Sequence, residues 1–283
     1  MLTDHGKQRI SYGFLCATPF IACGAALVRP LRIPGVYQVI GGVLLAAIAT
    51  AAWTLGARAI RADVQMRRLL ALAGTLLLTP FAMVALFWVG LGGPWAASAS
   101  ENQMRYLLLI AVVLAATGGF VVLKEALSQA SERLYSTLGF AAVMLACGLY
   151  LVWDAFVFGL YFAQEHGGTM PPAIVSLHPF QNLLVCLAAA LTYVATTAFA
   201  ASLARTQWLG RKASLAYIII GLSASFFIVV TVLAYPDPAA ASQPWYTIPG
   251  LILTVPALPL IMPALLGVVL LRHAGDEQQR GAA

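Results

Sequence analysis

Charged residues are scarce in this chain of 283 residues: they make up 9% of it, whereas 61% of the residues are hydrophobic. A soluble domain carries about 25% charged residues, so a single water-soluble core is excluded. The polar stretches between the apolar runs are too short to fold as separate domains. The composition is typical of a polytopic membrane protein, in which about 20 apolar residues span the hydrocarbon at each crossing.

Lysine and histidine are rare as well. The three lysines, Lys7, Lys124 and Lys212, lie at the ends of apolar runs. Because a retinal Schiff base needs a lysine in the middle of a span, retinal is excluded as a cofactor. The chain has four histidines, and no two of them belong to different spans at matching depth. A membrane haem with two histidine ligands is therefore excluded too.

Motifs of known catalytic chemistry are missing. There is no HExxH, P-loop, GxSxG or paired-aspartate motif, and no nucleophile and base occur at a recognisable spacing. The four cysteines fall within apolar runs without a CxxC, which is typical of small buried residues rather than of a disulfide framework. A catalytic function is thus the less favoured class. The net charge of +6 indicates membrane-facing helix ends, not a nucleic-acid partner.

Eight apolar runs are long enough to be transmembrane helices. They cover residues 12–28, 36–56, 69–92, 106–123, 134–162, 180–203, 214–235 and 248–271. The sequence therefore predicts an all-α integral membrane protein with eight transmembrane helices.

Basic residues gather on alternate sides of these runs. The basic clusters include Lys7 and Arg9, Arg58 to Arg68, Lys124 and Arg133, Arg205 to Lys212, and Arg272 with Arg280. Most of the opposite loops carry no Lys or Arg, although Arg29 and Arg32 depart from the pattern. By the positive-inside rule, both termini lie in the cytoplasm of a bacterial-type inner membrane.

The chain also shows signs of an internal repeat. When it is shifted by about 143 positions, residues 37–73 fall on 180–216, so that Gln38 meets Gln181 and Arg68 meets Arg211. Four helices in each half would give the halves the same orientation in the membrane. We therefore expect two tandem four-helix bundles, residues 1–130 and 131–283, as a parallel 4+4 repeat.

Asp154 is the one acid or base inside an otherwise apolar run, 149–158. A carboxylate in hydrocarbon costs several kcal/mol unless it is protonated, paired or hydrated. Its position, about 20 residues into the fifth span, puts it in the outer half of the membrane. Asp154 is therefore the first candidate for a functional residue.

Other polar side chains follow Asp154 toward the predicted outer face. The candidate ligand- or proton-binding residues are Asp154, Tyr150, Tyr161, His178, Gln181 and Asn182. They predict a polar pocket that opens to the outside. The alternative is a hydrated rim at the interface, with Asp154 snorkelling or capping the loop. Glu165, His166 and His178 are weak candidates for metal ligands because their spacing matches no known motif.

The last span contains Pro249 near its start and, further along, Pro256, Pro259 and Pro263. Each proline inside a helix removes an N–H donor and obstructs the carbonyl four residues earlier. The carbonyls of Ile252, Val255 and Pro259 would then lack donors near the middle of the bilayer. The prolines therefore predict a hinge or a broken helix that lines a cavity, or a static kink.

Three functions remain open from the sequence. The first is a small secondary transporter or a protein that binds a lipophilic ligand, with a small molecule, lipid or quinone in the polar pocket. The second is a non-catalytic subunit of a respiratory or export complex, with protein partners or as a homo-oligomer. The third is a membrane enzyme that uses a cluster of His, Glu and Asp at the outer face. In all three, the lipid bilayer is the constant partner.

Overall fold

The computed structural model describes residues 4–27, 36–84, 97–167, 177–234 and 250–280. These residues form eight α-helices and two short 3-10 helices, with no strand among them. The α-helices are α1 (Asp4–Leu27), α2 (Val36–Leu55), α3 (Gln65–Val84), α4 (Ala99–Gln129), α5 (Leu134–Glu165), α7 (His178–Arg205), α8 (Arg211–Ala234) and α9 (Ala257–Arg280). The 3-10 helices are η1 (Ala57–Arg61) and η5 (Leu251–Thr254).

Seven of these helices, all except α1, are long and apolar enough to cross a membrane. The longest, α4 with 31 residues and α5 with 32, extend over about 46 and 48 Å at 1.5 Å per residue. Both exceed the ~30 Å of bilayer hydrocarbon. The predicted class, a multi-pass helical membrane protein, is confirmed. The first predicted span is a helix, but within the described residues it is not among the seven.

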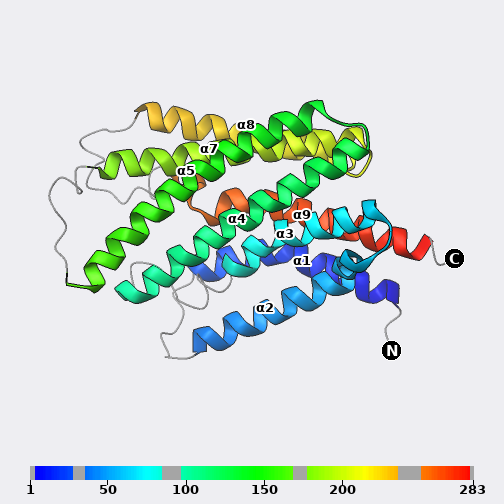
Figure 1. The fold of residues 1–283 in the computed structure, drawn as a ribbon, viewed down its shortest axis with the longest axis horizontal. Helices are drawn as coiled ribbons and strands as arrows, with labels where there is room; N and C mark the ends of the chain where they lie inside the picture. The colour runs from blue at the N-terminus through cyan, green and yellow to red at the C-terminus, as the bar shows by residue number, and fades with distance from the viewer. Residues whose placement is uncertain (1–3, 28–35, 85–96, 168–176, 235–249, 281–283) are drawn as a thin grey trace.

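The helices lie side by side in a defined order. Figure 1 shows α8, α7, α5, α4 and α3 following one another across the molecule, and α9 lies against α3. The α1 and α2 helices pack on each other, and α1 also packs on α9. Extensive contacts therefore join the two predicted halves, through α4 with α5 and through α3 with α9.

The start of α4 is set by a capping box. The Ser98 hydroxyl accepts a hydrogen bond from the Glu101 backbone N–H (3.2 Å), and the Glu101 carboxylate accepts one from the Ser98 N–H (2.7 Å). This arrangement satisfies two donors that a helix start leaves without intrahelical partners. As a result α4 begins at Ala99, seven residues before the predicted start of the span at Tyr106.

Glycines set the distance between α3 and α9. A Cβ atom on Gly74 would lie 2.8 Å from the Gly267 carbonyl oxygen, and one on Gly267 would lie 2.7 Å from the Gly74 oxygen. The two backbones therefore touch at this crossing, as small residues allow in membrane helices.

The turn between α4 and α5 contains a buried carboxylate, Glu132. Its two oxygens accept hydrogen bonds from the backbone N–H groups of Tyr135 and Ser136, each at 3.2 Å. Burial opposes ionisation of Glu132, but the nearby Ser202 hydroxyl and these backbone hydrogen bonds outweigh it and hold the pKa of the carboxyl below its ordinary value. The ionised side chain thus stabilises the first turn of α5.

We expect Glu132→Gln to lower stability at neutral pH by about 1–2 kcal/mol, because charge-assisted hydrogen bonds at the helix start are weakened. Since the pKa is lower in the folded state, this stabilisation is complete above the unfolded value, about 4.3, and is lost as the pH falls through the folded value. Thermal unfolding in detergent at a series of pH values measures it. The variant and the wild type should converge in acid, whereas Glu125→Gln, at an exposed position on α4, should match the wild type throughout.

Candidate functional site

Asp154 is buried in the middle of the helix bundle. Its side chain is 1% exposed, and it lies on α5 about 11 residues before the helix ends at Glu165. Neither carboxylate oxygen has a hydrogen-bond partner among the described residues. The alternative prediction, in which Asp154 snorkels at a hydrated rim or caps the loop, is therefore wrong: the side chain neither reaches the surface nor lies at a helix end.

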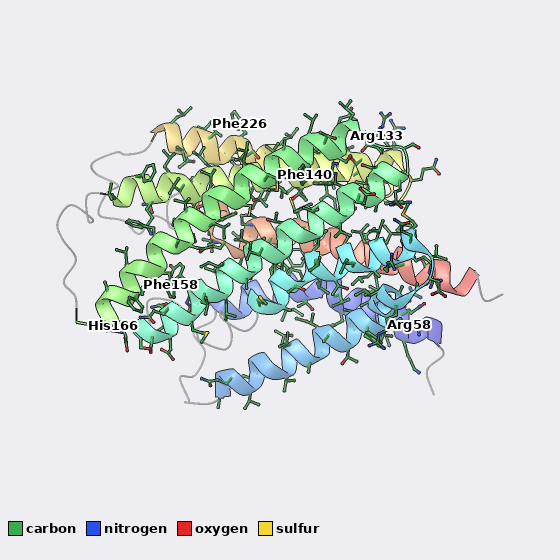
Figure 2. The ribbon with its side chains drawn as sticks, in the orientation of Figure 1. Arg58, Arg133, Phe140, Phe158, His166 and Phe226 are labelled. Atoms are coloured by element: carbon green, nitrogen blue, oxygen red, sulfur yellow. The ribbon has the colours of Figure 1, made fainter. Side chains whose placement is uncertain are left out.

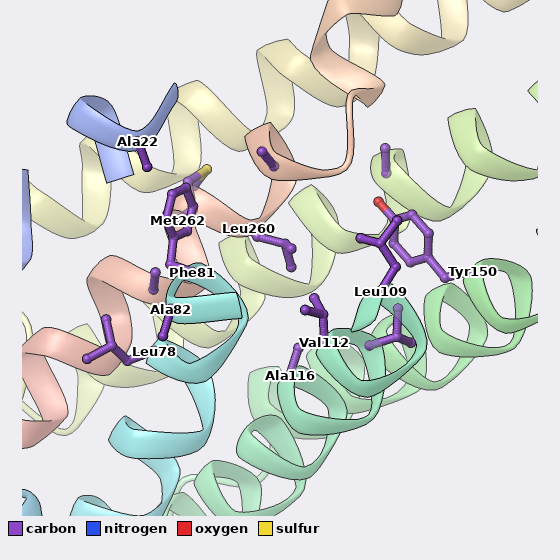
Figure 3. Close-up of a cluster of buried hydrophobic side chains, with 14 of the residues drawn as sticks. Ala22, Leu78, Phe81, Ala82, Leu109, Val112, Ala116, Tyr150, Leu260 and Met262 are labelled. Carbon is purple, nitrogen blue, oxygen red and sulfur yellow. The ribbon is translucent and has the colours of Figure 1, made fainter. Parts of the chain in front are cut away.

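A small cavity of about 30 Å³ adjoins Asp154. Its walls come from α4, α5 and α7 and from the start of α9, with Leu109, Thr192 and Leu260 among the lining residues. Figure 3 shows Leu109 beside Tyr150, with Leu260 on the side of α9. One water molecule needs about 10–15 Å³ of such space, so the cavity has room for about two waters.

Asp154 is the one carboxylate among the residues that line this cavity, and most of the others are apolar. Tyr150, one helical turn earlier on α5, also lines it, and its buried hydroxyl lies close to the Thr192 hydroxyl of α7. Thr192 of α7 donates its hydroxyl proton to the Ala188 carbonyl oxygen at 2.8 Å. Asp154 therefore presents two carboxylate oxygens that only water, a proton or a small ligand could satisfy.

Aromatic rings adjoin the cavity at Trp153, which also lines it. The Tyr106 ring meets the Trp153 ring edge-on at 5.7 Å and stacks on the Tyr161 ring at 5.6 Å, measured between ring centroids. Gln103 donates a hydrogen bond to the Tyr161 carbonyl oxygen at 3.1 Å. We call Tyr106, Trp153 and Tyr161 the aromatic cluster. It joins α4 to α5 on the side of the cavity that leads to the end of α5.

Arg105 is a further buried charged residue, which the hydropathy pattern did not indicate. Its side chain is 2% exposed, and its Nε atom donates to the Asn102 side-chain oxygen at 3.1 Å. Hydropathy placed Arg105 just outside the fourth span, because the apolar run begins at Tyr106. The Ser98–Glu101 capping signature was the signal that would have put Arg105 inside the helix.

Apart from Tyr150, none of the other predicted ligand- or proton-binding residues whose side chains the structure describes lines the Asp154 cavity. Tyr161 belongs to the aromatic cluster. Gln181 and Asn182 of α7 are partly buried, and neither lines the cavity, although the Gln181 side-chain oxygen is buried without a partner in the described segments. His178 is in the first turn of α7, but its side chain lies outside the described residues.

Glu165 and His166 are exposed where α5 ends. His166 Nδ1 lies 2.8 Å from the Phe162 carbonyl oxygen. Glu165 is eleven positions after Asp154 on α5, which is about 16 Å along the helix. Within the described segments, no three His, Cys, Asp or Glu side chains lie close enough together to hold a metal ion.

The predicted last span is interrupted before α9 begins. Residues 251–254 form η5, Pro256 immediately precedes α9, and Pro259 lies in the first turn of the helix. The N–H groups of a first turn have no intrahelical acceptor, so Pro259 removes no helix hydrogen bond. Pro263 lies inside α9.

The predicted loss of carbonyl partners is wrong at two positions. The Ile252 carbonyl oxygen accepts the Val255 N–H at 3.1 Å, and the Val255 oxygen accepts the Leu258 N–H at 2.8 Å. The 3-10 turn and the new helix start supply these donors, which a single kinked helix would lack. Pro256 nevertheless lines the cavity, so the break lies next to Asp154.

Comparisons with known proteins place this chain in no family. No protein-family model matches the sequence, no curated protein matches it, and no solved structure matches the fold.

Proposed function

We propose that this protein is a small secondary transporter coupled to protons, in which Asp154 binds and releases the proton. The observation that carries the proposal is the carboxylate itself: it is 1% exposed, and both of its oxygens lack partners beside a cavity. Ionisable residues inside the membrane are rare and are typical of substrate and proton pathways.

The energetics favour a proton as the first ligand. An ionised carboxylate without a partner is strongly disfavoured in an apolar site, whereas its neutral form is tolerated. A proton bound to Asp154 therefore stabilises the closed arrangement of α4, α5, α7 and α9. Release of that proton requires water to reach the cavity, and hydration of the cavity would open the arrangement.

The size of the cavity supports a proton and about two waters rather than a bound solute. A solute, lipid or quinone would need another arrangement of the helices. We propose that the break at Pro256 is the hinge for this change, with Pro259 and Pro263 beyond it in α9. The break adjoins the cavity, and the helix does not continue on the N-terminal side of α9.

The orientation that we propose follows the basic residues. Figure 2 shows Arg58 and Arg133 at one end of the bundle and His166 at the other. The end with Arg58 and Arg133 faces the cytoplasm of a bacterial-type inner membrane, by the positive-inside rule. Both termini lie at that same end in Figure 1. The 4+4 repeat with a boundary at residue 130 stays a prediction.

The proposal is tested in proteoliposomes that enclose a pH-sensitive dye. With an imposed pH gradient and an extract of the cell's small molecules outside, the wild-type protein should dissipate the gradient. Asp154→Asn should reduce the rate to that of empty vesicles, because asparagine cannot release a proton, and Asp154→Glu should retain part of it. Asp63→Asn makes the same chemical change at an exposed position and should behave as the wild type.

Two results would reject the transporter. One is a wild-type rate equal to that of empty vesicles, and the other is an Asp154→Asn rate equal to that of the wild type. Co-purification of a stoichiometric protein partner from the native membrane, together with an inert Asp154→Asn, would favour the membrane subunit instead.

A further inference from the structure

A polar groove lies at the end of the bundle opposite His166, where α4 leads into α5. It has a volume of about 500 Å³ and is lined by Lys124, Glu125, Ser128 and Gln129 of α4 and by Arg133 and Thr137 at the start of α5. Pockets that hold small molecules have volumes of about 300–1,000 Å³. This groove is separate from the Asp154 cavity, with which it shares no lining residue.

Neither cation of the groove, Lys124 or Arg133, forms an ion pair with a carboxylate of the residues that the structure describes. The Lys124 ammonium lies 5.6 Å from the centre of the Phe140 ring. Figure 2 shows Phe140 on α5 and Arg133 at the turn. The one acid in the groove, Glu125, accepts a hydrogen bond from the Gln129 amide at 3.0 Å. The groove therefore carries an excess of positive charge and fits an anion.

Apolar side chains continue the groove toward the bilayer. On α4, Val121 lies seven residues before Ser128, and on α5, Met144 lies seven residues after Thr137. Seven residues are about two helical turns and 10 Å, so each pair shares a helix face. Val121 and Met144 are 42% and 45% exposed, and both lie about 10 Å from the groove toward the middle of their helices. A ligand with an anionic head and an apolar tail would have its head in the groove and its tail along these apolar side chains.

We propose that the groove binds the phosphate headgroup of an anionic phospholipid, with its acyl chains along Val121 and Met144. Lys124 and Arg133 hold the phosphate from α4 and α5, and Arg133 can donate two parallel hydrogen bonds to it. The lipid thereby links the ends of α4 and α5, two helices that also line the Asp154 cavity. In other membrane proteins, basic pockets between helices at the cytoplasmic side bind such headgroups.

Native mass spectrometry of the protein from mixed micelles tests the site. The micelles contain phosphatidylglycerol and phosphatidylcholine with identical acyl chains in equal amounts. The wild-type protein should retain phosphatidylglycerol in preference. The double variant Lys124→Gln/Arg133→Gln should lose roughly tenfold or more of that preference, since each cation near the surface contributes about 1 kcal/mol.

The matched control is Arg211→Gln/Lys212→Gln, which removes two exposed cations outside the groove and should keep the preference. An equal loss in both double variants would overturn the site, because it would show an effect of total charge. A third arm adds inorganic phosphate at millimolar concentration. Displacement of the lipid by phosphate alone would identify a phosphate site instead of a lipid site and would also overturn the proposal.

Discussion

Gly267→Val should leave little folded protein, because the side chain would occupy space that the α3 backbone already fills. The first added atom, Cβ, would lie 2.7 Å from the Gly74 carbonyl oxygen and 3.1 Å from the Leu77 Cβ atom. A backbone oxygen cannot rotate away, so α3 and α9 would have to separate. Overpacking in a core costs about 1–3 kcal/mol where side chains can adjust, and here the adjustment involves two whole helices that pack extensively on each other.

The measurement is the fraction of protein that elutes as a single species from a mild detergent, together with its thermal midpoint. Gly267→Ala should give a smaller loss than Gly267→Val, because it adds the one colliding atom and no more. The matched control is Gly148→Val on α5, where a Cβ atom would meet nothing within 4 Å. Comparable losses at both glycines would contradict the close crossing, because they would point to a general penalty for valine in place of glycine.

The close crossing could not be foreseen from the sequence, although the helices themselves could. A run of apolar residues reports how one segment partitions between water and lipid, and this local property predicts the class of the protein and most helix positions. It says nothing about which helices touch. Gly74 and Gly267 are 193 positions apart, and only the structure shows that they meet.

The sequence predicted the part of the candidate site that lies on α5, but not the parts that other helices contribute. Helical periodicity placed Tyr150 and Asp154 on one face of the fifth span, and the structure puts both beside the same cavity. The expectation that Glu165 and His166 would join them was wrong, because these residues continue the same rigid helix away from Asp154. The opposite walls of the cavity, to which Leu109 and Thr192 belong, depend on packing between helices. No sequence pattern at these two residues indicated that they would line the cavity.

The helix ends show where hydropathy and backbone chemistry compete. Hydropathy begins the fourth span at Tyr106, but the Ser98 capping box begins α4 at Ala99 and brings Arg105 into the bundle. In the last span, Pro256 follows the 3-10 turn η5, and α9 starts directly after it. In both places, backbone hydrogen bonding and not hydropathy determines where the helix begins.

Dicyclohexylcarbodiimide should modify Asp154 and leave Glu132 unmodified. This apolar reagent reacts with protonated carboxyl groups that it reaches from the membrane. Asp154 is surrounded by apolar walls and lacks a hydrogen-bond donor among the described residues, so its neutral form is favoured. Glu132 is buried too, but two backbone N–H groups hold its carboxylate and stabilise the ionised form, which does not react.

Modification of Asp154 also requires that the cavity open, because a space of about 30 Å³ is too small for the reagent. Labelling should therefore proceed slowly in the wild-type protein, and mass spectrometry of the digested protein should find the adduct on the peptide that contains Asp154. Asp154→Asn should remove that adduct completely while the protein remains folded. A wild-type protein that stays unlabelled after long incubation would mean that the cavity does not open, and a transporter that works by opening it would then be excluded.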